Sequence, residues 1–217
     1  MLKHPSFKNL HVVDHPLVQH KLTRMRDETC ETGEFRRLLR EISYLLGYEV
    51  TRNLPVSKMT IRTPMEKMDA PVLDGPLPVV VPVLRAGLGM AEGLTQLIPD
   101  CRIGHVGLYR DEKTHRPVEY LVRLPKPLQG EYYIVTDPML ATGHSSVHTL
   151  DVLGRHGIQA ERILLMCLVA APEGVTAMAE YYPQVPVFTA ALDRELNENA
   201  YIMPGLGDAG DRLFGTY

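Results

Sequence analysis

The sequence predicts an α/β fold in which a mainly parallel sheet is flanked by helices. Short, almost continuously apolar runs alternate along the chain with segments whose apolar residues recur at helical spacing. Such runs are typical of strands that are covered on both faces, as in a parallel sheet. A length of 217 residues is enough for one substantial core, and no repeat or linker divides the chain. We therefore expect a single domain over 1–217.

Two helices are expected before the first buried strand. Asp14 precedes Pro16 and an apolar series, which predicts a capped first helix. The second helix is indicated by an apolar stripe that is followed by Gly47. The residues of this stripe are Phe35, Leu38, Leu39, Ile42, Leu45 and Leu46.

Strands and helices alternate from residue 79 onward. We expect strands over 79–83, 103–109, 132–136, 162–169 and 186–191. We expect helices over 88–98, 145–156 and 173–182. This alternation indicates parallel pairing, and ligands of such sheets bind beyond the carboxyl ends of the strands.

Two segments depart from the alternation. Residues 110–130 combine dense charge with three prolines, which predicts a hairpin arm that projects from the sheet. Residues 193–217 are rich in glycine and aspartate but keep apolar side chains. We expect this tail to fold back as a loop region, a C-terminal hood over the sheet.

Composition excludes several classes of function. A formal net charge of −3 argues against nucleic-acid binding, because no basic excess is present to neutralise phosphates. No run of 18 apolar residues indicates a membrane span, and the first ten residues lack the apolar core of a signal peptide. The three cysteines are widely spaced and odd in number, which favours reduced thiols and a cytoplasmic location.

The segment 132–146 is the strongest indication of a binding site. An apolar strand stops at Asp137, passes through a loop of small residues and enters a helix at Ser145. This arrangement directs backbone N–H groups toward a phosphate, although most turns of this kind in α/β proteins bind nothing. The segment lacks the lysine of a Walker loop. Asp137 is placed to accept hydrogen bonds from hydroxyls beside the phosphate, as in a ribose 5-phosphate.

Two arginines are expected at the same edge of the sheet. Arg85 and Arg110 each follow a predicted strand, and the guanidinium group suits phosphate oxygens. Two arginines and a phosphate loop exceed the needs of one phosphate. Together they match phosphoribosyl pyrophosphate, a sugar phosphorylated at two positions.

Six segments, in order, resemble the uracil phosphoribosyltransferase family over nearly the whole chain. They are 14–22, 84–90, 107–111, 137–143, 167–174 and 204–212. The resemblance implies a type I phosphoribosyltransferase fold. It also implies transfer of the 5-phosphoribosyl group from phosphoribosyl pyrophosphate to uracil, which gives UMP and pyrophosphate in pyrimidine salvage.

The resemblance also implies roles for individual residues. Arg85 and Arg110 would hold the pyrophosphate and, with Asp137, form the catalytic set. The expected contacts to phosphoribosyl pyrophosphate are Arg85, Arg110, Asp137, Pro138, Met139, Leu140, Ala141, Thr142, Gly143, His144, Ser145 and Asp208. The expected contacts to uracil, largely through the main chain, are Ile202, Gly207, Asp208 and Ala209.

The same resemblance implies partners beyond the two substrates. Mg²⁺ is expected through the substrate pyrophosphate, with no metal site built from protein ligands. A homodimer or higher oligomer is expected, and some members of the family respond to GTP, for which the sequence identifies no site.

His144 stands where the family often has glycine, and three interpretations are open. Its backbone N–H serves the phosphate while the ring faces solvent, which we favour; the ring adds a phosphate contact; or the site is impaired. An impaired site would suit a non-catalytic regulator that binds nucleotides, and a phosphoribosyltransferase for another base is a further alternative. Retention of Arg85, Arg110 and Asp137 argues against the regulator.

Overall fold

The computed structural model describes residues 2–3, 6–110 and 117–216. Its main sheet has the strand order β1-β2-β11-β10-β8-β5-β6-β7, and β9 (Met139–Leu140) pairs with β10. The five predicted strands are confirmed. They are β5 (Val79–Leu84), β6 (His105–Arg110), β8 (Tyr133–Thr136), β10 (Ile163–Ala170) and β11 (Val187–Leu192).

Pairing among the central strands is parallel, as the alternation predicts. The parallel pairs are β11–β10, β10–β8, β8–β5 and β5–β6, and β2 (Leu10–Val12) adds to β11 in the same sense. Only edge pairs run antiparallel among the described strands of this sheet: β1 (Leu2–Lys3) with β2, and β6 with β7 (Pro117–Arg123).

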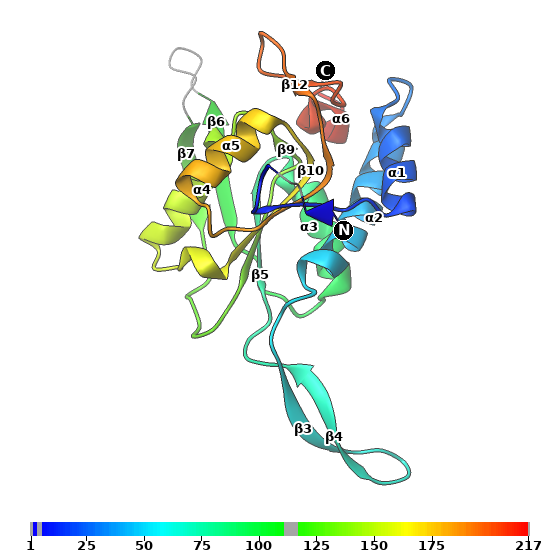
Figure 1. Cartoon of the computed structure of the whole chain (residues 1–217), viewed down its shortest axis with the longest axis vertical. Helices are drawn as coiled ribbons and strands as arrows, with labels where there is room; N and C mark the ends of the chain where they lie inside the picture. Colours follow the sequence, from blue (N-terminus) through cyan, green and yellow to red (C-terminus); the bar gives the residue numbers. More distant parts are fainter. Residues whose placement is uncertain (1, 4–5, 111–116, 217) are drawn as a thin grey trace.

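Helices cover both faces of the sheet (Figure 1). One face carries α1 (Pro16–Arg26), α2 (Thr32–Val50) and α3 (Gly87–Leu97), and the other carries α4 (His144–Arg155) and α5 (Pro172–Tyr181). Side chains of β5 alternate between the two cores: Val80 packs with the α1–α3 side, and Val79 and Val81 with the α4–α5 side. This burial on both faces explains the continuous apolar run in the sequence.

Two details of the N-terminal helices differ from expectation. The residue that caps α1 is His15, not Asp14, because Pro16 occupies the first helical position and His15 Nδ1 accepts a hydrogen bond from the Leu17 N–H at 3.2 Å. Gly47 lies inside α2 and does not end it. A Cβ at Gly47 would stand 2.6 Å from the Leu94 side chain, so the glycine permits the close packing of α2 against α3.

The hairpin that stands away from the sheet is not the predicted one. It consists of β3 (Val56–Arg62) and β4 (Lys67–Leu73), which pair antiparallel as a separate ribbon, seen at the foot of Figure 1. Within 110–130 the structure does place a hairpin strand, β7, but it extends the edge of the main sheet. The segment 111–116 lies outside the described residues.

The tail folds back, as predicted, and contains short regular elements. The strands β12 (Glu195–Leu196) and β13 (Ile202–Met203) pair antiparallel, and α6 (Ala209–Phe214) follows. The sequence predicts only a loop for this segment, because strands and helices this short do not produce a periodic apolar pattern. Among the described residues, no helix is both long enough and apolar enough to span a bilayer.

Candidate active site

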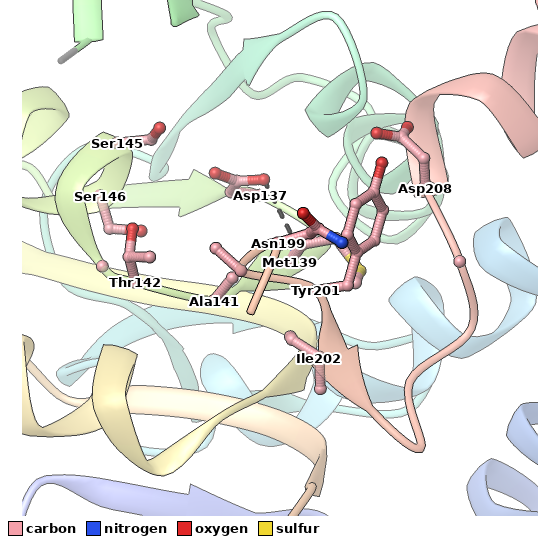
Figure 2. A pocket seen from close by; sticks show the side chains of 13 residues that line it. Asp137, Met139, Ala141, Thr142, Ser145, Ser146, Asn199, Tyr201, Ile202 and Asp208 are labelled. Atoms are coloured by element: carbon pink, nitrogen blue, oxygen red, sulfur yellow. Dashed lines mark hydrogen bonds between the residues drawn. The ribbon is translucent and has the colours of Figure 1, made fainter. Parts of the chain in front are cut away.

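A cavity of about 470 Å³ opens beyond the carboxyl end of β8, between the 137–146 loop and the folded-back tail. Figure 2 shows Thr142 and Ser145 on one side of Asp137, and Tyr201 and Asp208 on the other. The lining residues are Asp137, Met139, Ala141, Thr142, Gly143, Ser145, Ser146, Asn199, Ala200, Tyr201, Ile202, Gly207 and Asp208.

The loop after β8 is held by the neighbouring strand and ends at a helix N-terminus. The Asp137 N–H donates to the Met166 carbonyl of β10 at 3.1 Å. Gly143 then takes a left-handed conformation, with φ of 82°, and caps α4. The first turn of a helix leaves N–H groups without intrahelical partners, so the N-terminus of α4 directs donors and a positive dipole end toward the cavity.

Close packing of α5 supports this loop from behind. A Cβ at Gly174 would stand 2.5 Å from the Ala141 carbonyl oxygen and 2.6 Å from that of Leu140. Both oxygens belong to the backbone of the loop, which could move away from a Cβ only if the loop itself shifted. Glycine at this position therefore allows the first turn of α5 to press against the loop.

Asp137 and Asp208 contribute carboxylates from two walls of the cavity. Asp137 is half-buried, and its burial raises the pKa of this carboxyl group to about 7, although the Met139 N–H donates to Oδ1 at 3.5 Å. Asp208 caps α6, since its Oδ1 accepts a hydrogen bond from the Asp211 N–H at 2.9 Å. The two carboxylates differ in environment, because Asp208 is exposed.

Arg85 is not among the residues that line this cavity. It occupies the turn between β5 and α3, is exposed, and has its guanidinium carbon 5.4 Å from the centre of the Phe214 ring on α6. The peptide bond between Leu84 and Arg85 is cis. Arg110 is the last residue of β6, the strand next to β5 in the sheet.

Most of the predicted loop and tail residues meet at this cavity. Asp137, Met139, Ala141, Thr142, Gly143, Ser145, Ile202, Gly207 and Asp208 all line it. Pro138, Leu140 and Ala209 do not line it; they are buried and support it, as when the Pro138 carbonyl accepts from the N–H groups of Leu168 and Val169 at 3.0 Å.

His144 is exposed at the first position of α4 and does not line the cavity. The left-handed residue of this loop is Gly143, the residue before His144. The 137–146 loop therefore accommodates a side chain at His144, which begins α4 without a positive φ.

Sequence reasoning missed four lining residues. Ser146 lies one residue beyond the predicted loop, and Asn199, Ala200 and Tyr201 belong to the turn between β12 and β13. In that turn Asn197 Oδ1 accepts from the Tyr201 N–H at 2.9 Å. The asparagine residues at 197 and 199 were a turn signal, but nothing local indicated which surface the turn would cover.

The described residues contain no cluster of side chains that could bind a metal ion. Over 2–3, 6–110 and 117–216, no three His, Cys, Asp or Glu side chains form a group that could hold a metal ion.

Comparison with known proteins bears on the family and the fold of this chain. The family model for uracil phosphoribosyltransferase matches residues 12–216. A curated uracil phosphoribosyltransferase of Rhodospirillum centenum is 59% identical over 216 residues, which cover all of both chains. The solved structure of the AQ2163 protein from Aquifex aeolicus has a TM-score of 0.88 and 33% identity, covering 95% of this chain and 98% of that one.

A more distant solved structure bears on the fold alone. The purine phosphoribosyltransferase of Pyrococcus horikoshii is 15% identical, with a TM-score of 0.50 over 73% of this chain and 84% of that one. The architecture is thus that of the type I phosphoribosyltransferases. By its matched length and its identity to curated relatives, the chain belongs to the uracil phosphoribosyltransferase family.

Proposed function

We propose that this chain transfers the 5-phosphoribosyl group of phosphoribosyl pyrophosphate to N1 of uracil, with release of pyrophosphate and formation of UMP. The observation that carries the proposal is the meeting of the 137–146 loop and the 199–208 tail in one cavity. A phosphate site and a backbone-rich surface for a flat base then lie side by side. The family membership supports the same reaction.

In this reaction the bond between ribose C1 and the pyrophosphate oxygen breaks, a bond from C1 to uracil N1 forms, and the proton of N1 is released to water or to the departing pyrophosphate. Positive charge grows on the sugar and negative charge on the leaving group. Arg85 and Arg110 are assigned to the leaving group, where stabilisation of growing charge is usually the largest catalytic contribution. Holding both substrates in the cavity supplies the second contribution, proximity.

Asp137 is assigned to the ribose. Its carboxylate stands beside the N-terminus of α4, where the 5-phosphate would bind, so it can accept hydrogen bonds from the 2- and 3-hydroxyls. As an anion it also stabilises the cationic sugar of the transition state. Both tasks require the ionised form of the group.

Uracil is assigned to the main chain of Ile202, Gly207, Asp208 and Ala209. Gly207 has φ of 79° and lines the cavity, so backbone can approach a flat ring without an intervening Cβ. Cytosine reverses a donor and an acceptor, and each buried group left unpaired costs about 1–3 kcal/mol.

The residues present fit a magnesium ion that arrives with its substrate. Mg²⁺ is usually held by one or two carboxylates together with substrate phosphates, and Asp137 and Asp208 offer two carboxylates at the cavity. When bound, the ion supplies charge neutralisation to the pyrophosphate.

We also propose a homodimer in the cytoplasm. The β3–β4 ribbon exposes apolar side chains without a core beneath it, which supports burial against another copy of the chain. These side chains are Val56, Met59, Met65, Met68 and Leu73. The free thiols of Cys30, Cys101 and Cys167 support a reducing compartment.

The decisive experiment incubates the protein with Mg²⁺, phosphoribosyl pyrophosphate and uracil, and detects UMP by mass. Adenine, guanine, hypoxanthine, cytosine and orotate are offered in parallel. Formation of UMP alone supports the assignment; a different nucleotide, or none, refutes it. Adding GTP to the same assay tests the response that the family resemblance implied.

A further inference from the structure

We infer that Arg26, Asp193 and Arg212 form a clamp that positions the base-binding main chain and so determines base selectivity. None of the three lines the cavity beyond β8, although Arg26 and Arg212 line a neighbouring cavity of about 550 Å³. The inference rests on the proposed function, because it takes the tail as the surface that binds uracil. We call these residues the hood clamp.

The first half of the hood clamp is an ion pair that holds Gly205. Arg26 of α1 donates to both carboxylate oxygens of Asp193, Nη1 to Oδ2 at 2.8 Å and Nη2 to Oδ1 at 2.6 Å. The Asp193 side chain is 4% exposed. Gly205 receives one contact from each partner: its N–H donates to Asp193 Oδ2 at 2.9 Å, and its carbonyl accepts from Arg26 Nη1 at 2.6 Å.

The second half ties the next residue to the end of α1. Arg212 Nη1 donates to the Leu206 carbonyl at 2.9 Å and to the Met25 carbonyl at 2.6 Å. Its Nη2 donates to the carbonyls of Asp27 and Cys30, at 2.7 and 3.2 Å. The guanidinium carbon lies 4.7 Å from the centre of the Phe35 ring, so the group is fixed on one face as well.

These contacts converge on the residues just before the cavity. Gly205 and Leu206 are buried, whereas Gly207 and Asp208, which follow directly, are exposed and line the cavity. Gly205 has φ of 61°, and a Cβ there would stand 2.0 Å from the Ile202 carbonyl oxygen, so 202–205 form a tight turn. The clamp therefore fixes both the turn and the point from which the base-binding backbone starts.

Where main-chain groups bind the base, selectivity between bases depends on the positions of those groups. Backbone N–H and C=O groups are the same in every residue, so discrimination depends on where they stand. Misplacement by a fraction of an ångström weakens hydrogen bonds on both sides of the ring. The charged side chains that set those positions then become specificity determinants, although they do not touch the base.

The test compares Asp193→Asn, Arg26→Lys and Arg212→Lys with the parent enzyme. Asp193→Asn keeps the shape and removes the charge, whereas Arg26→Lys and Arg212→Lys keep the charge and remove the planar fork of donors. The matched control is Arg24→Lys, on the same helix, where the arginine pairs with Glu34 at the surface. Thermal unfolding of each variant establishes that it folds.

We expect the KM for uracil to rise about tenfold or more in the clamp variants, and the KM for phosphoribosyl pyrophosphate to rise by a clearly smaller factor, because Asp208 is its one assigned contact on the tail. The ratio of kcat/KM for uracil to that for cytosine should fall, and the Arg24→Lys control should match the parent. Hydrogen exchange without substrates should be faster at the amides of 202–208 in the clamp variants and unchanged in the 137–146 loop.

An equal rise of both KM values, or an unchanged uracil KM, overturns the clamp. So does unchanged exchange at 202–208. Because exchange is measured without substrate, it judges the clamp even if the parent makes no UMP. Absence of UMP from the parent would instead refute the proposed function.

Discussion

The hydroxyl of Thr136 donates a hydrogen bond to the main-chain carbonyl of Gly87 at 3.0 Å. Thr136 is the last residue of β8 and directly precedes Asp137, while Gly87 opens α3 two residues after Arg85. A Cβ on Gly87 would stand 2.3 Å from the Thr136 carbonyl oxygen. We assign Asp137 and Arg85 to opposite ends of the reacting bond. The backbone segments that carry them are thus in direct contact, at Thr136 and Gly87.

Gly87→Ala should destabilise the protein and lower turnover, because the added Cβ forces those backbones apart. We expect a loss of about 1–3 kcal/mol in the free energy of unfolding. Gly154→Ala is the matched control, since a Cβ at this helical position meets no atom within 4 Å and should be neutral or stabilising. Urea unfolding and the rate of UMP formation measure both effects. Equal behaviour of the two variants would contradict the argument.

The pH dependence of catalysis should report Asp137. Its pKa in the free protein is raised to about 7 by burial, so the carboxylate form increases as pH rises through about 7. We expect kcat/KM for phosphoribosyl pyrophosphate to rise through the same range. The Asp137→Asn variant should lose most of its activity, and its kcat/KM should no longer rise with pH in this range. A flat profile in the parent between pH 6 and about 8 would contradict the assignment.

Stability should change with pH in the opposite sense. The pKa of Asp137 in the folded state exceeds its unfolded value of 3.8, so between about pH 4 and 7 the folded state binds the extra proton. The stability from this group is complete at acid pH and is lost as pH rises through about 7. The substrate-free parent should therefore lose stability relative to Asp137→Asn over this range. Urea unfolding of both proteins at pH 5 and at about pH 8 measures the difference.

Arg85→Ala should impair catalysis far more than folding. The arginine is exposed, and its described contact is with the Phe214 ring, which is worth about 0.5–1 kcal/mol at an exposed site. Loss of a donor to growing charge typically lowers kcat by about 10²–10³-fold. Turnover equal to that of the parent at saturating Mg²⁺ would remove Arg85 from the mechanism.

His144→Gly and His144→Ala should leave catalysis nearly intact. The ring does not line the cavity, and the contribution expected of this residue is its backbone N–H at the start of α4. We expect the KM for phosphoribosyl pyrophosphate to stay within about twofold of the parent. A tenfold rise in both variants would instead establish a phosphate contact by the imidazole.

The strands and helices that could be predicted are those that a short stretch of sequence is enough to identify. Each buried strand of the main sheet is an apolar run, and each of the helices α3, α4 and α5 has an apolar stripe and a glycine or proline nearby. The order of these elements, with ligands at carboxyl strand ends, then places the 137–145 loop correctly. Asp137 and Gly143 reach the cavity for this reason, whereas Asp208, in the tail, was predicted only from the family resemblance.

The remainder depended on contacts between distant segments. The strands β3 and β4 have mostly exposed side chains of mixed polarity, so no alternation distinguished them from a loop. Tyr201 and Asn199 belong to a polar turn whose position over Asp137 is set by the tail as a whole. The ion pair between Arg26 and Asp193 spans 167 residues, a separation at which neither residue signals its partner.

The parallel strands also separate the end of the molecule that carries the candidate site from the end at which the strands begin. The residues that line the candidate site lie beyond the carboxyl ends of the strands, and the turn around Gly157, which precedes β10, is not among them. A Cβ at Gly157 meets nothing within 4 Å, but the φ of 80° favours glycine at this position itself, so changes belong beside it. A tag or surface anchor introduced beside Gly157, away from both the candidate site and the β3–β4 ribbon, should therefore leave UMP formation undisturbed.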